Sequence, residues 1–212
     1  LIKKTSGNIY VNCLDLDKRM WKIKKIINCS PQETAVCPNL TVKENLDFFA
    51  SVYGIKDLSK SKDIIDKFEL EPIYKQRART LSGGWRRKLS IAIALITGAQ
   101  ILFLDEPTLG LDVFSRRELW DIILELKKDR TIILTSHYLQ EIEALCDRVA
   151  VLSDGNVLTV GTVEELKKAN NTNDFEQAFM RTVEKYKKEH NIVVNKETGA
   201  VEEGKQKNEK SI

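Results

Sequence analysis

Two carboxylates stand together at the end of an apolar run in the middle of the chain. The run Ile101–Leu104 is followed directly by Asp105 and Glu106, and a later run, Thr131–Leu134, leads to His137. Short continuous apolar runs are typical of buried parallel strands, whose carboxyl ends meet at the sheet edge where ligands bind. One carboxylate can hold Mg²⁺ while its neighbour polarises water, and a histidine can contact a phosphate oxygen. The pattern therefore indicates phosphoryl-transfer chemistry.

A glycine pair supplies a second candidate phosphate contact. Ser82, Gly83 and Gly84 open a predicted helix over 84–97, and the free N–H groups and dipole of a helix N-terminus favour an anion. The usual phosphate loop, Gly-x-x-x-x-Gly-Lys followed by Ser or Thr, does not occur in the sequence. The only glycine followed by lysine is Gly204, and neither Ser nor Thr comes next. The chain thus has carboxylates and an anion-binding turn without the common phosphate cradle.

The elements that would position these residues alternate between strand and helix. The pattern predicts strands over 26–29, 101–104 and 131–134 and helices over 84–97, 114–127 and 138–146. This alternation predicts an α/β fold whose parallel sheet is covered by helices on both faces. Gln32 lies in the loop after the first of these strands, and its amide offers an acceptor to a metal and donors to a water.

The remaining segments read as a helical insertion and a C-terminal part. Thr41 and Glu44 match a capping box, and helical periodicity continues to about residue 75, so a small helical lobe is expected there. Asp154-Gly155 between apolar runs indicates a β-hairpin. A strand is also expected over 8–13, an amphipathic helix over 18–25, a capped helix from Thr162 and a further helix over 174–186.

Composition excludes several classes of protein. The 212 residues include 34 basic and 31 acidic ones, a balance too even to indicate a nucleic-acid partner, and none is expected. Four scattered cysteines and two histidines cannot form a zinc set at ligand spacing, so a reducing cytosolic setting is predicted. The apolar stretch 89–104 is interrupted by Gly98 and Gln100, which favours helix, turn and strand over a membrane span.

Together these motifs resemble those of the ATP-binding cassette (ABC) ATPases. Five motifs occur in that family's order: the glutamine loop at Gln32, the signature Leu81-Ser82-Gly83-Gly84, the strand ending in Asp105-Glu106-Pro107, the Leu111-Asp112 D-loop and the His137 switch. The resemblance covers roughly residues 1 to 165. It implies a P-loop NTPase-like α/β fold, with a parallel-sheet core and an inserted helical subdomain.

The resemblance also implies a role for each motif and a need for ATP and Mg²⁺. Glu106, as the water-polarising base, and His137 would be catalytic, while Asp105 and Gln32 would coordinate Mg²⁺. The residues implied in nucleotide binding are Gln32, Ser82, Gly83, Gly84 and Asp112. Of these, the turn Ser82–Gly84 would close over a nucleotide held mainly by a second ATPase subunit, so that a homo- or heterodimer encloses two ATP molecules.

The start of the chain resembles a later part of the family's sequence. The segment Lys4–Ile9 is similar to the stretch just after the phosphate-loop helix, so an N-terminally truncated chain is expected, without the first strand and the phosphate loop. About half a dozen charge-assisted hydrogen bonds, each worth roughly 1.5–3 kcal/mol, would be missing. The chain alone is therefore expected to bind ATP poorly and not to hydrolyse it. An uncovered sheet edge and apolar face would also make it marginally stable or aggregation-prone.

The expected domain organisation follows the motifs. The predicted parts are the N-terminal remainder of the ATPase core with the glutamine loop (1–36), the helical subdomain (37–80), the core with the signature, carboxylates, D-loop and histidine (81–165), C-terminal helices (166–190) and a charged, disordered tail (191–212).

The expected function is that of an ATPase subunit that powers transport through a separate membrane permease, from the cytoplasmic side of the cell membrane. Trp85, where the family most often has glutamine, favours an exporter-like subfamily for drugs or ions. One alternative is a soluble ABC ATPase acting on ribosomes or DNA, although the interval from Gln32 to Leu81 has no room for the long coiled coil of the DNA-repair type. Another is a non-catalytic partner, which would have no use for Glu106 and His137.

Overall fold

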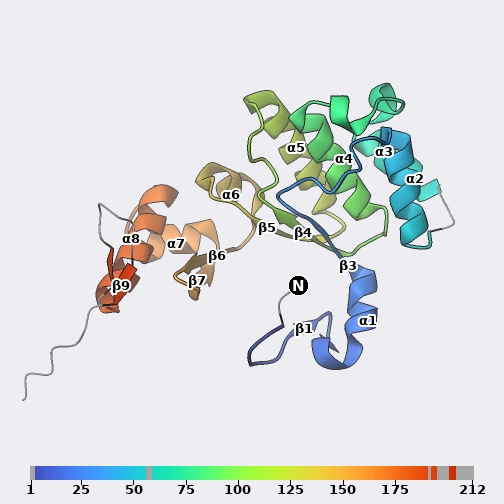
Figure 1. Ribbon diagram of the computed structural model, residues 1–212. Helices are drawn as coiled ribbons and strands as arrows, with labels where there is room; N and C mark the ends of the chain where they lie inside the picture. Colours follow the sequence, from blue (N-terminus) through green and yellow to red (C-terminus); the bar gives the residue numbers. More distant parts are fainter. Residues whose placement is uncertain (1–2, 56–58, 191, 195–200, 204–212) are drawn as a thin grey trace, which may run out of the picture. The chain divides into compact units, whose positions relative to one another are not determined.

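The computed structural model describes residues 3–55, 59–190, 192–194 and 201–203. The chain divides into two compact units, Leu1–His137 and Tyr138–Ile212, and each unit has its own fold. The predicted boundaries at residues 36, 80, 165 and 190 remain predictions. Figure 1 shows the first unit in blue to green and the second in yellow to red.

The first unit is built on a three-stranded parallel sheet in the order β3-β4-β5. Its strands are β3 (Ile27–Ser30), β4 (Ile101–Asp105) and β5 (Thr131–Thr135). Asp105 pairs with Thr135, so β4 and β5 end at the same edge. The prediction of an α/β fold with a parallel sheet is confirmed, and all three strands lie within two residues of the expected ranges.

Helices α4 (Gly83–Leu95) and α5 (Val113–Leu126) lie on one side of this sheet (Figure 1). Successive residues of a strand point to opposite faces, and the residues facing these helices, Leu102 and Leu104, are fully buried. The other face carries Cys29, Phe103 and Ile133, which pair across the three strands and are exposed. We call these three residues the apolar row. Within the described residues of the first unit these three side chains are exposed, so helical cover of this second face remains a prediction.

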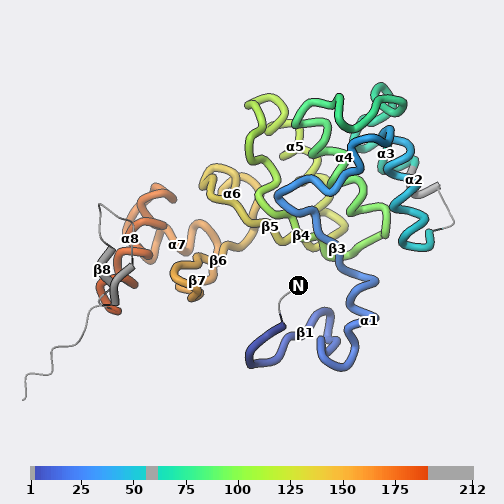
Figure 2. The backbone as a smooth tube through the Cα atoms, viewed as in Figure 1, coloured from blue at the N-terminus to red at the C-terminus, as the bar shows by residue number. Residues whose placement is uncertain are grey.

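The predicted helical lobe is present between β3 and β4, and Figure 2 follows the chain through it. It contains α2 (Val42–Val52), α3 (Ser59–Lys67) and the short 3-10 turns η1 (Glu71–Ile73) and η2 (Ala78–Thr80). The capping box is confirmed, because Thr41 accepts from the backbone of Glu44 and the Glu44 carboxylate accepts from the Thr41 N–H. Helix α2 packs against α4 through a buried face.

The N-terminal segment folds back on itself where a single strand was expected. Two short strands, β1 (Tyr10–Val11) and β2 (Leu14–Asp15), pair antiparallel, and α1 (Leu16–Ile26) follows. Asn12 and Cys13 have φ values of 48° and 60°. This left-handed conformation reverses the chain, and an alternating apolar pattern does not reveal it.

The second unit contains a β-hairpin packed among helices. Its elements are α6 (Leu139–Leu145), β6 (Val149–Ser153), β7 (Asn156–Gly161), α7 (Val163–Ala169) and α8 (Phe175–Glu189). Asp154 and Gly155 have φ values of 50° and 76°, as a type I′ turn requires, so the predicted hairpin is confirmed. The Thr162 capping box is also present.

Two further strands, β8 (Ile192–Val194) and β9 (Val201–Glu203), pair antiparallel in the segment expected to be disordered. That expectation therefore fails for these two strands, and the rest of 191–212 lies outside the described residues. Across the described ranges, no helix is both long enough and apolar enough to cross a membrane.

Candidate functional site

The chain turns sharply where β4 ends, and Glu106 lies in that turn. Its φ of 45° is in the left-handed region, which residues other than glycine rarely adopt. Its backbone N–H donates to the carbonyl oxygen of Thr135 at 3.1 Å and lies 3.2 Å from the Thr135 hydroxyl. These contacts hold the strained turn against β5. Such outliers cluster at functional sites, and this one falls on a predicted catalytic residue.

The two predicted catalytic side chains, Glu106 and His137, lie in direct contact. Glu106 Oε1 is 2.9 Å from His137 Nδ1, with the carboxylate side chain 20% exposed and the imidazole 55% exposed. The other carboxylate oxygen, Oε2, is buried and has no hydrogen-bond partner among the residues that the structure describes. Buried polar atoms are rarely left unsatisfied, so this oxygen marks a place for a polar ligand or a water.

Asp105, the predicted metal ligand, is held by a residue that the motifs did not include. The Thr135 hydroxyl donates to Asp105 Oδ1 at 2.5 Å, and Asp105 is exposed at the edge of the sheet. Thr135 was missed because a threonine at a strand end is unremarkable in a sequence. Thr135 pairs with Asp105 in the parallel ladder, so a prediction of the strand register would have placed the two side chains together.

Gln32 is brought to the same edge by the side chain of Arg87, which was also missed. Arg87 donates to the carbonyl oxygens of Pro31 at 2.5 Å, Gln32 at 3.3 Å and Pro107 at 2.8 Å, and also to that of Asp105. The backbone of the glutamine loop (Pro31–Gln32) therefore lies next to that of the carboxylate turn (Asp105–Pro107). The available signal was helical phase, because Arg87 shares its face of α4 with buried Ser90, Ile91 and Ala94.

The signature turn (Ser82–Gly84) caps α4 at its N-terminus. Ser82 Oγ accepts from the Trp85 N–H at 3.4 Å. A Cβ added to Gly84 would lie 2.8 Å from Ser115 Oγ, whereas one added to Gly83 would meet only a Leu111 methyl group, at 3.9 Å. Gly84 therefore allows α4 and α5 to approach closely, while Gly83 leaves backbone open to a ligand.

Asp112, the predicted D-loop contact, caps α5. Its Oδ1 accepts from the N–H groups of Phe114 at 2.9 Å and Ser115 at 3.0 Å, and its Oδ2 accepts from the Ser115 hydroxyl at 2.7 Å. The hydroxyl hydrogen bond and then the backbone ones lower the pKa of Asp112. Asp112 thus belongs with the signature turn, through Ser115, and Glu106 and His137 form a separate group with Asp105 and the glutamine loop.

The donors at the carboxylate turn fit Mg²⁺ that arrives with a nucleotide. In the described part of the chain, no three His, Cys, Asp or Glu side chains gather into a metal-binding group of their own. Magnesium in phosphate sites is commonly held by only one or two protein groups, the phosphates and water supplying the rest. The exposed carboxylate of Asp105 and the amide of Gln32 match that donor set.

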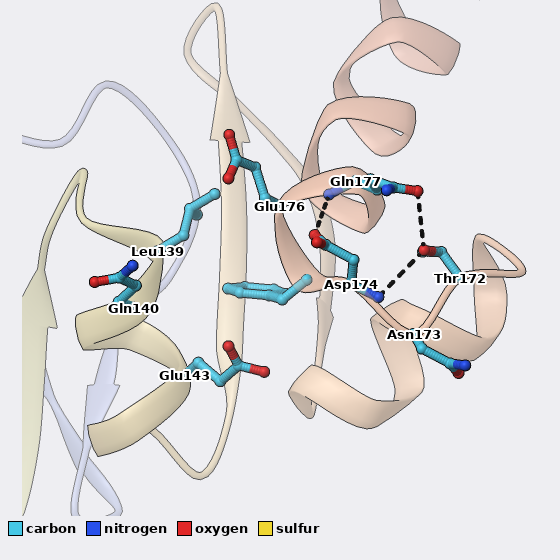
Figure 3. Close-up of a pocket in the computed structure, with 9 residues that line it drawn as sticks. Leu139, Gln140, Glu143, Thr172, Asn173, Asp174, Glu176 and Gln177 are labelled. Carbon is cyan, nitrogen blue, oxygen red and sulfur yellow. Dashed lines mark hydrogen bonds between the residues drawn. The ribbon is translucent and has the colours of Figure 1, made fainter.

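A cavity of about 560 Å³ in the second unit contains none of the predicted site residues. It lies between α6 and the start of α8, and Figure 3 shows Glu143, Glu176 and the capping residue Asp174 around it. Asp174 accepts from the Gln177 N–H at 2.9 Å, and Glu143 pairs with Lys167 at 2.5 Å. The acidic groups around this cavity do not match the chemistry of a phosphate ligand.

A parallel α/β sheet with a carboxylate pair and a histidine at its carboxyl edge has the architecture of a nucleotide-binding domain. Residues 1–109, more than half of the chain, match the family model described as "ABC transporter". The chain therefore belongs to the ABC transporter family.

Several curated relatives are similar to most of this chain. It is 41% identical over 170 residues, 79% of the chain, to human "Phospholipid-transporting ATPase ABCA3", and covers 10% of that protein. It is 38% identical over 170 residues to rat "ATP-binding cassette sub-family A member 17", again covering 79% of the chain and 10% of the relative. It is also 38% identical over 200 residues to "ABC transporter A family member 9" of Arabidopsis thaliana, covering 92% of the chain and 20% of the relative. The chain thus spans between a tenth and a fifth of the length of these proteins.

A solved structure described as "Structure of ATP binding subunit of ABC transporter" superimposes with a TM-score of 0.73 at 23% identity, covering 84% of this chain and 77% of that one. The likeness shows a shared fold, and it agrees with the fold class that the motifs implied.

Proposed function

We propose that this chain is the ATP-binding and ATP-hydrolysing part of an ABC transporter. The observation that carries the proposal is the 2.9 Å contact between Glu106 and His137 at the carboxyl edge of the parallel sheet, beside Asp105. Membership of the ABC transporter family supports it, and the resemblance to that family's motifs implies a site made of these residues. The roles of the individual residues are part of the proposal.

In this site Glu106 accepts a proton from the water that attacks the γ-phosphoryl group. His137 holds Glu106 through Oε1, and the strained turn at Glu106 fixes the direction of the carboxylate. Thr135 orients Asp105, which together with Gln32 is the proposed ligand of Mg²⁺. Bound with the nucleotide, Mg²⁺ would neutralise charge on the β- and γ-phosphates.

The proposed site needs phosphate donors beyond those of the motifs described above. The sequence contains no phosphate loop, and the apolar row leaves one face of the sheet exposed. We propose that residues outside this sequence form the cradle and cover that face. The 212-residue chain by itself then binds ATP poorly and does not hydrolyse it.

A second ATPase domain completes the proposed assembly. Ser82, Gly83 and Gly84, with Asp112 beside them, would contact the nucleotide held by that domain, which is either identical or different. The open space at Gly83 supports this role, because a phosphate can approach bare backbone there.

The proposed setting is the cytoplasmic side of a membrane, where the chain works with a membrane permease. Trp85 in the signature favours an exporter-like subfamily for drugs or ions. The name of the human relative, a phospholipid-transporting ATPase, makes a phospholipid the first substrate to test. ATP-dependent transfer of labelled phospholipid in proteoliposomes, compared with transfer of a drug, tests this choice. Co-purification with ribosomes or DNA instead of membranes would favour the soluble alternative.

The deciding experiment measures magnesium-dependent ATP hydrolysis by the complete protein. Glu106→Gln and His137→Ala should each lower the rate by about 10²–10⁴-fold, as expected for loss of a positioned base or its partner. Glu125→Gln, an exposed change on α5, serves as the control and should leave the rate unchanged. Full activity of Glu106→Gln would refute the catalytic assignment. ATP hydrolysis by the purified 212-residue chain, abolished by Glu106→Gln, would refute the need for an outside cradle.

A further inference from the structure

Arg87 lies one turn into α4, three residues after the signature turn, and only 4% of it is exposed. A guanidinium remains charged at every physiological pH and carries five N–H donors, so it is rarely buried unless those donors are used. Its place in the run Arg86-Arg87-Lys88 would suggest a solvated basic face, but the three side chains have different surroundings.

The two neighbours of Arg87 point elsewhere. Arg86 is exposed, whereas Lys88 is buried against α5, where it pairs with Glu118 at 2.9 Å and lies 4.6 Å from the centre of the Trp85 ring. Of these three basic residues, Arg87 is the one that donates to the site loops. Because of its position around the helix, Arg87 makes different contacts from Arg86 and Lys88.

Hydrogen bonds from Arg87 join two loops that are far apart in sequence. Nη1 reaches the carbonyl oxygens of Pro31 and Gln32, while Nε reaches that of Pro107 and Nη2 that of Asp105. Two of these carbonyls belong to the glutamine loop, which contains the proposed magnesium ligand Gln32. The other two belong to Asp105 and Pro107, the neighbours of Glu106 in the carboxylate turn. A planar fork of donors can reach all four, whereas the compact ammonium of a lysine cannot.

We infer that Arg87 is a positioning residue of the ATP-hydrolysing site, which sets the glutamine loop against the carboxylate turn. The inference rests on the proposed function, since it names a residue that acts through Gln32 and Asp105. Because Arg87 stands on α4, it also links these loops to the helix that begins with the signature turn.

The test compares Arg87→Lys with Arg86→Lys in the complete protein. Both changes keep the charge and the helix propensity, but only Arg87→Lys removes a guanidinium that contacts the two loops. The rate of ATP hydrolysis is measured over a range of ATP concentrations, and amide hydrogen exchange is followed in the segments 31–36 and 106–110 and in β4 and β5. Arg87→Gln, which retains two amide donors, replaces Arg87→Lys if that variant is insoluble.

Arg87→Lys should lower kcat by about 10- to 100-fold, in line with the cost of misplacing catalytic groups by roughly 1 Å. KM for ATP should stay within about threefold, because Arg87 contacts backbone and not the nucleotide. Exchange should become faster in both loops and remain unchanged in β4 and β5, while Arg86→Lys changes neither quantity.

A kcat within twofold of the parent would overturn the inference, and so would loops that exchange at the parental rate. Uniformly faster exchange would also overturn it, because it would indicate general destabilisation. If the parent protein hydrolyses no ATP, the proposed function fails, and the catalytic part of the inference fails with it. The exchange data then still decide, separately, whether Arg87 holds the two loops together.

Discussion

Gly83→Ala and Gly84→Ala add the same methyl group to adjacent residues, yet the structure predicts different effects on stability. At Gly83 the new Cβ would make an ordinary contact with Leu111, at 3.9 Å. At Gly84 it would lie 2.8 Å from Ser115 Oγ and 3.1 Å from Ser115 Cβ. Neither glycine has a positive φ, so alanine is compatible with the backbone at both positions.

The expected difference in stability between the two variants follows from two opposing effects. Replacing glycine by alanine within a helix favours folding by roughly 0.5–1 kcal/mol, and both variants share this gain. At Gly84 the Ser115 hydroxyl can rotate away only by losing its 2.7 Å hydrogen bond to Asp112, and the contact with Ser115 Cβ persists in every rotamer. Overpacking of this kind costs about 1–3 kcal/mol. Gly84→Ala should therefore be about 1–3 kcal/mol less stable than Gly83→Ala.

Urea denaturation of the 212-residue chain at low concentration, followed by tryptophan fluorescence, measures the difference. In thermal unfolding, each kcal/mol of lost stability should lower the melting temperature by roughly 2–4 °C for a chain of this size. Ser115→Gly removes both contacting atoms, so in a double-mutant cycle it should restore the stability lost in Gly84→Ala. Equal stability of the two alanine variants, or no coupling with Ser115, would refute the proposed approach of α4 and α5.

Three further predictions concern charged groups. Although Cys29 is exposed, the neighbouring protein removes part of the water around its thiol, and this desolvation, followed by the charge of Asp105, raises the pKa of Cys29. Iodoacetamide at pH 8 should therefore alkylate Cys29 more slowly in the folded chain than in urea, and Asp105→Asn should speed the reaction in the folded chain. The pKa of Asp112 is lowered by the Ser115 hydroxyl and the backbone N–H groups. The ionised carboxylate therefore stabilises the fold above its ordinary pKa of about 4, and this stabilisation is lost as the pH falls through the lower pKa of the folded state. Asp112→Asn should remove that part of the acid dependence in urea titrations at pH 2–6. Lys88 is buried, while its partner Glu118 is largely exposed. Glu118→Gln leaves the buried charge of Lys88 without its carboxylate, so it should lower the free energy of unfolding by about 1–3 kcal/mol more than Lys88→Met does. The reverse order of the urea midpoints would contradict this prediction.

The motifs and elements that depend on local chemistry could be predicted from the sequence. The capping boxes at Thr41 and Thr162 and the turn at Asp154-Gly155 need only neighbouring residues, and the strands need only short apolar runs. The contact between Glu106 and His137 was also accessible, because parallel strands bring their carboxyl ends to one edge.

Features that depend on the three-dimensional arrangement could not be predicted. Helical phase could indicate that Arg87 is buried, but its acceptors are backbone carbonyl oxygens 18 to 56 residues away, which a sequence does not reveal. The reversal at Asn12 and Cys13 depends on backbone angles that the alternating pattern does not encode. The capping role of Asp112 is local and was missed for another reason: the family resemblance assigned this residue to a nucleotide contact.

The exposed apolar row has a topological explanation. Both connections in the sheet, from β3 through the helical lobe and α4 to β4, and from β4 through α5 to β5, cross it in the same direction. Because such crossovers are right-handed, both place their helices on the same face. Helices reach the opposite face only where the strand order reverses, and in open α/β sheets that reversal is the point at which ligands bind. Beside β3, a reversal would set the covering helix over the apolar row and its N-terminus near Gln32 and Asp105. The proposed phosphate cradle and the cover of the apolar row are then parts of the same structural element.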